Sequence, residues 1–211
     1  MDFTEFKNKL RKLPVISYRD LEVLKEDGQA MRNQLVRWQK RGLLVQLRRG
    51  LYILNEADRK LTPSLSFLAN RLYEPSYVSL EYALSHYGLI PEQAGEVTSV
   101  STRKPTRFHN DFGSFVYQHI KPQAFRGFRE ARDSSGLTFL IADPEKAILD
   151  FFYLNMRRFY GLGPKVFKGS FRFQNLEGLK KTRLLELARS YSSKKLSYIV
   201  KEFCAYLSKE K

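Results

Sequence analysis

Apolar residues recur at helical spacing close to the N-terminus. Four of them lie three or four positions apart: Phe3, Phe6, Leu10 and Leu13. They predict a first helix over residues 2–12, which Pro14 ends because proline lacks the backbone donor that a continuing helix needs. Ser17 and Asp20 have the spacing of a short capping box and predict the start of a second helix.

A third amphipathic helix is predicted from about Gln29 to Arg41. Its buried stripe consists of Met31, Leu35 and Trp38. Two apolar, strand-like runs, residues 43–47 and 51–54, then flank Arg48-Arg49-Gly50 and predict a short β-hairpin with both arginines at its tip. Three helices followed by a hairpin predict a winged helix-turn-helix domain over residues 1–55.

The rest of the chain alternates between helical and strand-like patterns. Residues 56–63 are polar and end in Pro63, which predicts a linker. Val97–Thr102 and Ser114–Ile120 are rich in strand-forming residues, and Asp143-Pro144 has the form of an N-cap followed by proline at the first helical position. We therefore expect an α+β chain, with the winged helix followed by a mixed α/β domain over residues 64–211.

The polar face of the third predicted helix matches the chemistry of duplex DNA. Four of its side chains can reach base edges with paired hydrogen bonds: Gln29, Arg32, Asn33 and Arg37. Four cations on the helix end and the hairpin are placed to hold phosphates: Lys40, Arg41, Arg48 and Arg49. No Asp or Glu occurs from Gly28 to Leu51, so this segment suits a polyanion.

Composition supports the same partner. The formal net charge of +15 and the pI near 9.9 imply a wide positive field that attracts phosphate. A single cysteine, Cys204, excludes an intrachain disulfide and fits a reducing cytosol. No signal peptide is apparent, and no apolar run approaches the roughly 18 residues of a membrane span, so we expect a cytoplasmic protein.

A second basic segment lies between Asp150 and Glu177, where no acidic residue occurs. Five cations stand there among phenylalanines and tyrosines, in a stretch whose glycines favour a loop: Arg157, Arg158, Lys165, Lys168 and Arg172. Such a mixture can hold nucleic acid by charge and stacking. It can equally be a protein-binding surface, or an aromatic anchor beneath a basic surface.

Candidate catalytic and metal-binding residues are few. The three histidines and Cys204 have no zinc-ligand spacing, and Cys204 lies in an apolar stripe typical of a core residue. The one acidic cluster is Asp143, Glu145 and Asp150, in which helix capping already explains Asp143. We expect no catalytic residue, cofactor or metal. The alternatives are a nucleic-acid-processing enzyme that uses Asp143 and Glu145, and an RNA-binding module.

Four stretches in this order carry a resemblance to a known family. They are Leu43–Leu54 (LLVQLRRGLYIL), the helix Tyr77–Leu89 (YVSLEYALSHYGL), Val97–Thr102 with the hairpin after it, and Ala142–Phe151 (ADPEKAILDF). With them, the chain resembles the AbiEi-type antitoxins of type IV toxin–antitoxin systems, which act in abortive infection, and related transcriptional regulators.

The resemblance implies a function for each part of the chain. The N-terminal winged helix would bind inverted repeats in its own promoter and repress its operon. The C-terminal domain would counteract a nucleotidyltransferase-like toxin encoded beside it, with or without direct contact. The base-reading and phosphate-holding residues follow from the chain's own chemistry, whereas the antitoxin role follows from the resemblance.

Overall fold

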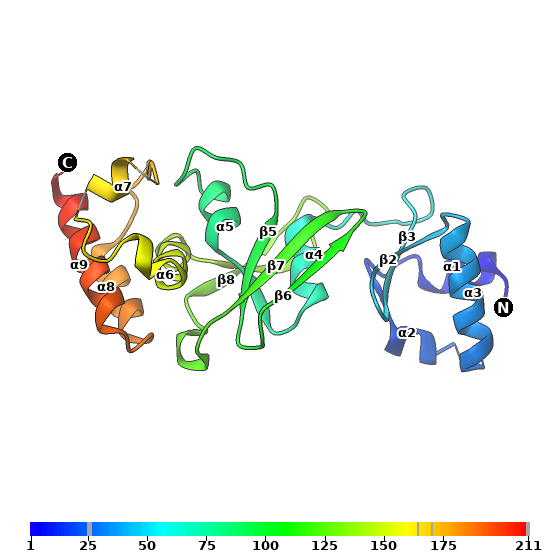
Figure 1. The fold of residues 1–211 in the computed structure, drawn as a ribbon. Helices are drawn as coiled ribbons and strands as arrows, with labels where there is room; N and C mark the ends of the chain where they lie inside the picture. Colours follow the sequence, from blue (N-terminus) through cyan, green and yellow to red (C-terminus); the bar gives the residue numbers. More distant parts are fainter. Residues whose placement is uncertain (25–26, 164, 170, 210–211) are drawn as a thin grey trace.

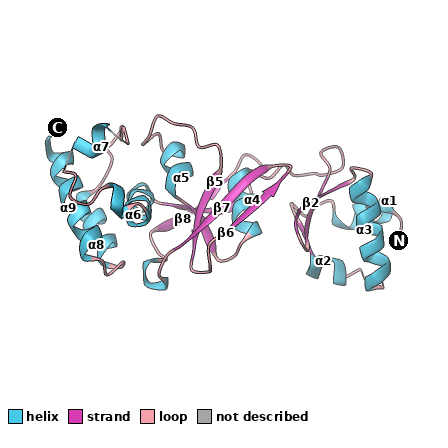
Figure 2. Ribbon diagram, viewed as in Figure 1, coloured by secondary structure: helices cyan, strands magenta, loops and turns pink. Residues whose placement is uncertain are grey.

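The computed structural model describes residues 1–24, 27–163, 165–169 and 171–209, and these form a mixed α and β fold (Figures 1 and 2). A small sheet with three helices occupies one end of the molecule, a larger sheet lies in the middle, and a group of helices closes the other end (Figure 1). No helix in the described ranges has the length and apolar character that crossing a membrane requires.

The N-terminal end holds the small sheet and the first three helices. Its elements are α1 (Phe3–Leu10), β1 (Ile16–Ser17), α2 (Tyr18–Glu22), α3 (Gly28–Lys40), β2 (Leu44–Arg48) and β3 (Leu51–Leu54). The strands are antiparallel in the order β1-β3-β2. Trp38 of α3 packs against the rings of Phe3 and Phe6, so the predicted apolar stripes of the first and third helices meet in one core.

Local capping explains where these helices begin. The predicted capping box is confirmed: Ser17 Oγ accepts from the backbone N–H of Asp20, and the Asp20 carboxylate accepts from the backbone N–H of Ser17. Asp27 caps α3 by accepting from the backbone N–H groups of Gln29 and Ala30. The third helix and the hairpin therefore stand where the sequence places them, within one or two residues.

A six-stranded mixed sheet forms the centre, with strands in the order β6-β7-β5-β4-β9-β8. β4 pairs with β9 and β5 with β7 in parallel, and the other neighbours are antiparallel. The strands are β4 (Ser76–Val78), β5 (Val97–Ser101), β6 (Thr106–Asn110), β7 (Gly113–His119), β8 (Phe128–Arg132) and β9 (Thr138–Ala142). The helices around them are α4 (Leu65–Leu72), α5 (Leu80–His86), η1 (Pro122–Ala124) and α6 (Pro144–Leu154).

The C-terminal helices stand at the end of the molecule opposite to α3 (Figure 1). They are η2 (Met156–Arg158), α7 (Lys165–Gly169), α8 (Lys181–Arg189) and α9 (Lys194–Lys209). The apolar stripe of the last helix is confirmed, because Leu196, Ile199, Val200 and Phe203 are each at most 1% exposed.

Three sequence-based predictions need correction here. The helix assigned to residues 77–89 is shorter, because Ser76–Val78 forms strand β4 and α5 begins at Leu80. The stretch expected to be a loop after Asp150 contains η2 and the short helix α7. Asp143 does occupy the N-cap position of α6, but its side chain makes no capping hydrogen bond.

The small sheet packs directly against the central part. Four side chains of the N-terminal segment belong to the large hydrophobic core rather than to the small one: Val15, Leu47, Leu51 and Ile53. Two hydrogen bonds reinforce this junction. Arg48 Nε donates to the Leu72 carbonyl at 2.8 Å, and Asn110 Nδ2 donates to the Leu47 carbonyl at 3.0 Å. One face of the β2–β3 hairpin is therefore packed against the central part of the molecule.

Candidate nucleic-acid interface

The face of α3 opposite to its buried stripe is open to solvent. Met31, Leu35 and Trp38 are at most 7% exposed, which fixes the rotation of the helix. The outer face carries all of the predicted base-reading side chains together with the two cations at the end of the helix, and all of these are exposed: Gln29, Arg32, Asn33, Arg37, Lys40 and Arg41. Val36, 50% exposed, lies among them. The structure therefore brings these six predicted residues together on α3 and its C-cap residue, Arg41.

Weak internal contacts orient part of this face. Gln29 Nε2 donates to Asn33 Oδ1 at 3.3 Å, so the two amides lie side by side. Arg32 Nε donates to the Gly28 carbonyl at 3.0 Å, in the first turn of the helix. Within the described ranges, the side chains of Arg37, Lys40 and Arg41 have no ion-pair or hydrogen-bond partner. Their cationic groups are thus available to an external anion.

The two arginines of the hairpin differ in their surroundings. Arg49 is exposed at the turn beside Gly50, whose φ of 76° is the left-handed conformation that glycine adopts most easily. Arg48 instead points to the junction, where Nε is bonded to the Leu72 carbonyl and Nη1 donates to the Arg49 carbonyl at 3.1 Å. A phosphate contact by Arg48 stays a prediction, and it would compete with these bonds.

The five cations of the second basic segment do not form a single free patch. The guanidinium of Arg158 lies 4.5 Å from the ring centre of Phe171, and Arg172 pairs with Glu92. Arg157, Lys165 and Lys168 are exposed on η2 and α7. Of the interleaved aromatic residues, Phe159, Phe167 and Phe173 are at most 5% exposed and pack in the core. The aromatic pattern of this segment is therefore mainly an anchor.

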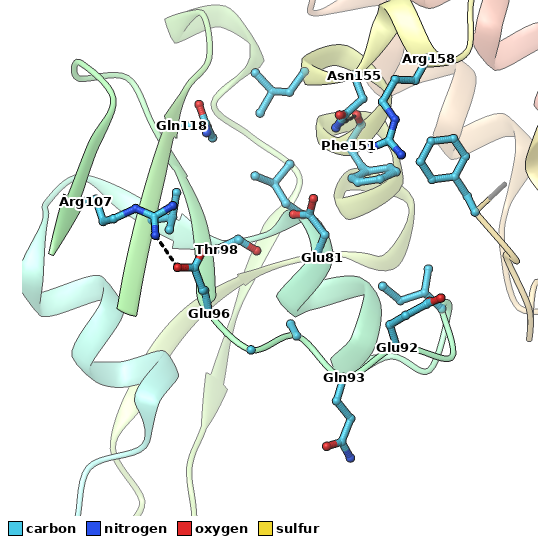
Figure 3. A pocket seen from close by; sticks show the side chains of 17 residues that line it. Glu81, Glu92, Gln93, Glu96, Thr98, Arg107, Gln118, Phe151, Asn155 and Arg158 are labelled. Atoms are coloured by element: carbon cyan, nitrogen blue, oxygen red, sulfur yellow. Dashed lines mark hydrogen bonds and ion pairs between the residues drawn. The ribbon is translucent and has the colours of Figure 1, made fainter. Parts of the chain in front are cut away.

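A cleft of about 640 Å³ lies between α5, the segment after it, β5–β7, the end of α6 and η2 (Figure 3). Its charged walls are largely neutralised, because Arg107 Nη1 lies 2.5 Å from Glu96 Oε1 and Glu92 pairs with Arg172. Thr98 Oγ1 is occupied, since it donates to the Ser79 carbonyl. The lining includes no His, Cys or Ser, so the cleft offers no pairing of a nucleophile with a base.

The three acidic residues of the predicted cluster have separate surroundings. Asp143 lies 3.9 Å from Arg129 and 3.7 Å from Arg183. Glu145 Oε1 accepts from the backbone N–H of Lys180 at 2.9 Å. Asp150 is sealed in the core. In the part of the chain that the structure describes, no three His, Cys, Asp or Glu side chains converge as metal ligands. These carboxylates share no common site for an ion.

Asp150 belongs to a buried polar network that sequence analysis missed. Lys146 Nζ contacts Asp150 Oδ1 at 2.5 Å and donates to the Tyr191 hydroxyl at 2.6 Å. Tyr191 in turn donates to Oδ1 at 2.6 Å, while Tyr77 and Ser79 donate to Oδ2 at 3.0 and 2.7 Å. The available signal was a Lys and an Asp four residues apart inside an otherwise apolar helix.

Burial dominates the proton affinities in this network. It raises the pKa of Tyr77 and of Tyr191 well above the ordinary value, and the negative charge of Asp150 raises both further. Burial lowers the pKa of Lys146, and Asp150 opposes that effect. With every member hydrogen-bonded and closed to solvent, the network ties α6 to β4 and to the end of α8.

Comparisons with protein-family models and with curated proteins give no match to this chain.

Proposed function

We propose that this protein is a sequence-specific DNA-binding repressor whose residues 1–55 form a winged helix-turn-helix. The observation that carries the proposal is the outer face of α3, where amide and cationic side chains are exposed above a buried apolar stripe. The element order, with three helices followed by the β2–β3 hairpin, supports α3 as the recognition helix. The net charge of +15 supports a polyanionic partner.

The proposal assigns two classes of contact. Gln29, Arg32, Asn33 and Arg37 read base edges in the major groove, and Val36 can meet a thymine methyl group. Lys40, Arg41 and Arg49 hold phosphates, with Arg48 behind them at the junction. The exposed cations on η2 and α7 add phosphate contacts if the DNA extends along the molecule.

The resemblance to AbiEi-type antitoxins adds a cellular role to the proposal. In this role the protein acts in the cytoplasm, represses its own operon by binding inverted repeats in the promoter, and counteracts a nucleotidyltransferase-like toxin. The neighbouring reading frame is the first test of the role, because a nucleotidyltransferase encoded there supports it and any other neighbour weakens it. Growth of cells that produce both proteins then measures the rescue directly.

Binding to the promoter region, measured by fluorescence anisotropy, tests the DNA-binding proposal. Asn33→Ala or Arg37→Ala should cost roughly 1–3 kcal/mol on the specific site and little on random duplex. The matched control is Arg132→Ala, an exposed arginine on β8 that should leave both affinities unchanged. Equal losses on both sequences would assign Asn33 and Arg37 to phosphate contacts.

Turnover assays separate this proposal from an enzymatic function. Pure protein incubated with Mg²⁺, nucleoside triphosphates and labelled DNA or RNA should leave all of them unchanged. Cleavage or nucleotide transfer that disappears with Asp143→Asn or Glu145→Gln would replace the repressor by a nucleic-acid-processing enzyme. Competition of duplex DNA against duplex RNA tests the third possibility, because the deep, narrow major groove of RNA does not admit a helix.

A further inference from the structure

Two tyrosine rings are exposed together at the C-terminal end of the molecule. Tyr160 is 49% exposed and Tyr198 is 44% exposed, and their ring centres lie 5.3 Å apart at an interplanar angle of 62°. Lys195 Nζ lies 5.5 Å from the centre of the Tyr160 ring, and Leu162, 60% exposed, follows closely in the chain. Large exposed aromatic groups that cluster in this way are informative, because single exposed apolar side chains are common and pairs of rings are not.

The backbone holds both rings outward. Tyr198 lies on the side of α9 away from the stripe that buries Ile199 and Val200. Tyr160 follows η2, and its neighbour Phe159 is 3% exposed and stacked on Phe171. Each tyrosine therefore adjoins a residue anchored in the core, so the two rings are presented by fixed elements.

A hollow of about 450 Å³ is lined by two serines of the turn before α9, Ser192 and Ser193, and by four residues of α9: Lys194, Ser197, Tyr198 and Lys201. Within the described ranges, neither of these lysines has an ion-pair partner. The surrounding sequence is cationic, with twelve Lys or Arg against three acidic residues, Glu177, Glu186 and Glu202, over residues 151–202. This charge balance favours a polyphosphate partner over an apolar protein surface.

We propose that Tyr160, Tyr198 and the lysines around them form a binding site for single-stranded nucleic acid. Exposed aromatic faces stack on unpaired bases of any sequence, whereas the bases of a duplex are already stacked on one another. Lys194, Lys195 and Lys201 follow the phosphates of the same strand. The site lies at the end of the molecule opposite to α3 (Figure 1), so it is separate from the proposed base-reading face and does not rest on that assignment.

Fluorescence anisotropy of the full-length protein with a labelled twelve-nucleotide oligo(U) or oligo(dT) tests the site, and the two probes separate RNA from DNA. The Tyr160→Ala/Tyr198→Ala double variant should bind the single strands at least about fivefold more weakly. Tyr160→Phe/Tyr198→Phe keeps both rings and should bind within about twofold of the wild type, by the same stacking argument. Tyr18→Ala, which removes a tyrosine that is 46% exposed on α2, is the matched control and should have no effect.

The salt dependence of single-strand binding and the affinity for a duplex provide a second test. Lys195→Gln and Lys201→Gln should each lower the salt dependence of single-strand binding by about 0.7 in the log–log slope. A blunt duplex of unrelated sequence should bind the double alanine variant as it binds the wild type. The proposal fails if the wild-type protein does not bind either single strand, if the alanine variant binds as the wild type does, or if the phenylalanine variant loses as much as the alanine variant. Any of these results would point to a protein partner for the two rings.

Discussion

Lys146 and Asp150 lie one turn apart on α6, and both side chains are completely closed to solvent with Nζ 2.5 Å from Oδ1. Removing two charges from water is costly, and their attraction compensates only if the remaining hydrogen-bonding groups are also satisfied. Here three hydroxyl groups, from Tyr77, Ser79 and Tyr191, complete the contacts of the carboxylate. These bonds join elements from distant parts of the chain, so the pair specifies how α6 sits on the central sheet.

Removing one partner of this pair should be strongly destabilising. Lys146→Met leaves the Asp150 carboxylate buried without a cation, and we expect a loss of roughly 3–5 kcal/mol in the free energy of unfolding. Urea denaturation measures the loss. Lys194→Met, the same change at an exposed lysine, should stay within about 0.5 kcal/mol of the wild type. A loss below about 1 kcal/mol for Lys146→Met would mean that the pair is hydrated in solution.

The raised pKa values of Tyr77 and Tyr191 predict alkaline destabilisation. Above pH 10 the unfolded chain releases these protons and the folded chain keeps them, so stability present below pH 10 is lost as the pH rises. The pKa of Lys146 is lowered in the folded protein, so this residue makes stability rise with pH, but only below its ordinary pKa of 10.5. Each tyrosine should contribute a slope of about 1.4 kcal/mol per pH unit.

Urea denaturation at several pH values between 10 and 12 checks this slope. Tyr191→Phe should reduce this slope by about 1.4 kcal/mol per pH unit, which is the contribution of one proton. Tyr18→Phe, at an exposed position, should leave the slope unchanged. An identical slope in the wild type and in Tyr191→Phe would show that Tyr191 ionises within the folded protein.

Local signals predicted the N-terminal elements well. The spacing of Met31, Leu35 and Trp38 determines which face of α3 is buried, and the Ser17–Asp20 capping box fixes the start of α2. The strand order of the central sheet was beyond sequence reasoning, because the parallel pairing of β4 with β9 joins residues far apart in the chain. Two of the three residues of β4, Tyr77 and Val78, were assigned to a helix, since so short a run carries no period of its own.

The candidate site was predictable only as far as it depends on one helix. The exposed side chains of α3 follow from the helical period, whereas the position of Arg48 depends on a carbonyl of α4 that no local pattern reveals. The buried network likewise needs Tyr77 and Tyr191, which are more than a hundred residues apart. The exposure of Tyr160 next to buried Phe159 depends on how η2 meets α9.

Arg48 and Arg49 should therefore differ as alanine variants. Arg49→Ala should weaken binding to every duplex and lower the salt slope by about 0.9, with no effect on the melting temperature. Arg48→Ala removes the hydrogen bond to the Leu72 carbonyl as well, and should cost about 1 kcal/mol of stability. Thermal melts and salt titrations of the two variants measure these effects. An unchanged melting temperature for Arg48→Ala would mean that this bond contributes nothing to the junction.

Cys204 should react slowly with thiol reagents. Burial raises the pKa of its thiol, with Lys181 opposing the effect, and the residue packs against the large core. Because the thiolate is the reactive form, native protein at pH 8 should react with Ellman's reagent at least about tenfold more slowly than protein in urea. Equal rates in the two conditions would place the thiol in solvent.

The covered hairpin predicts the behaviour of an N-terminal fragment. A fragment of residues 1–60 keeps α3 and should keep its sequence preference, but it loses the exposed cations of the C-terminal part. Its affinity for DNA should be weaker, and each lost phosphate contact should lower the salt slope by roughly 0.9.

The same fragment exposes Val15, Leu47, Leu51 and Ile53, which are at most 5% exposed in the full chain. We therefore expect it to melt at a lower temperature and to bind a hydrophobic dye that the full-length protein does not bind. The full chain carrying Gln at Arg157, Arg158, Lys165, Lys168 and Arg172 separates the two effects, because it removes the charges and keeps the junction. That variant should reproduce the shallower salt slope and retain the melting temperature. If it binds DNA as the wild type does, the five cations serve another partner, and the weakness of the fragment comes from its exposed apolar surface alone.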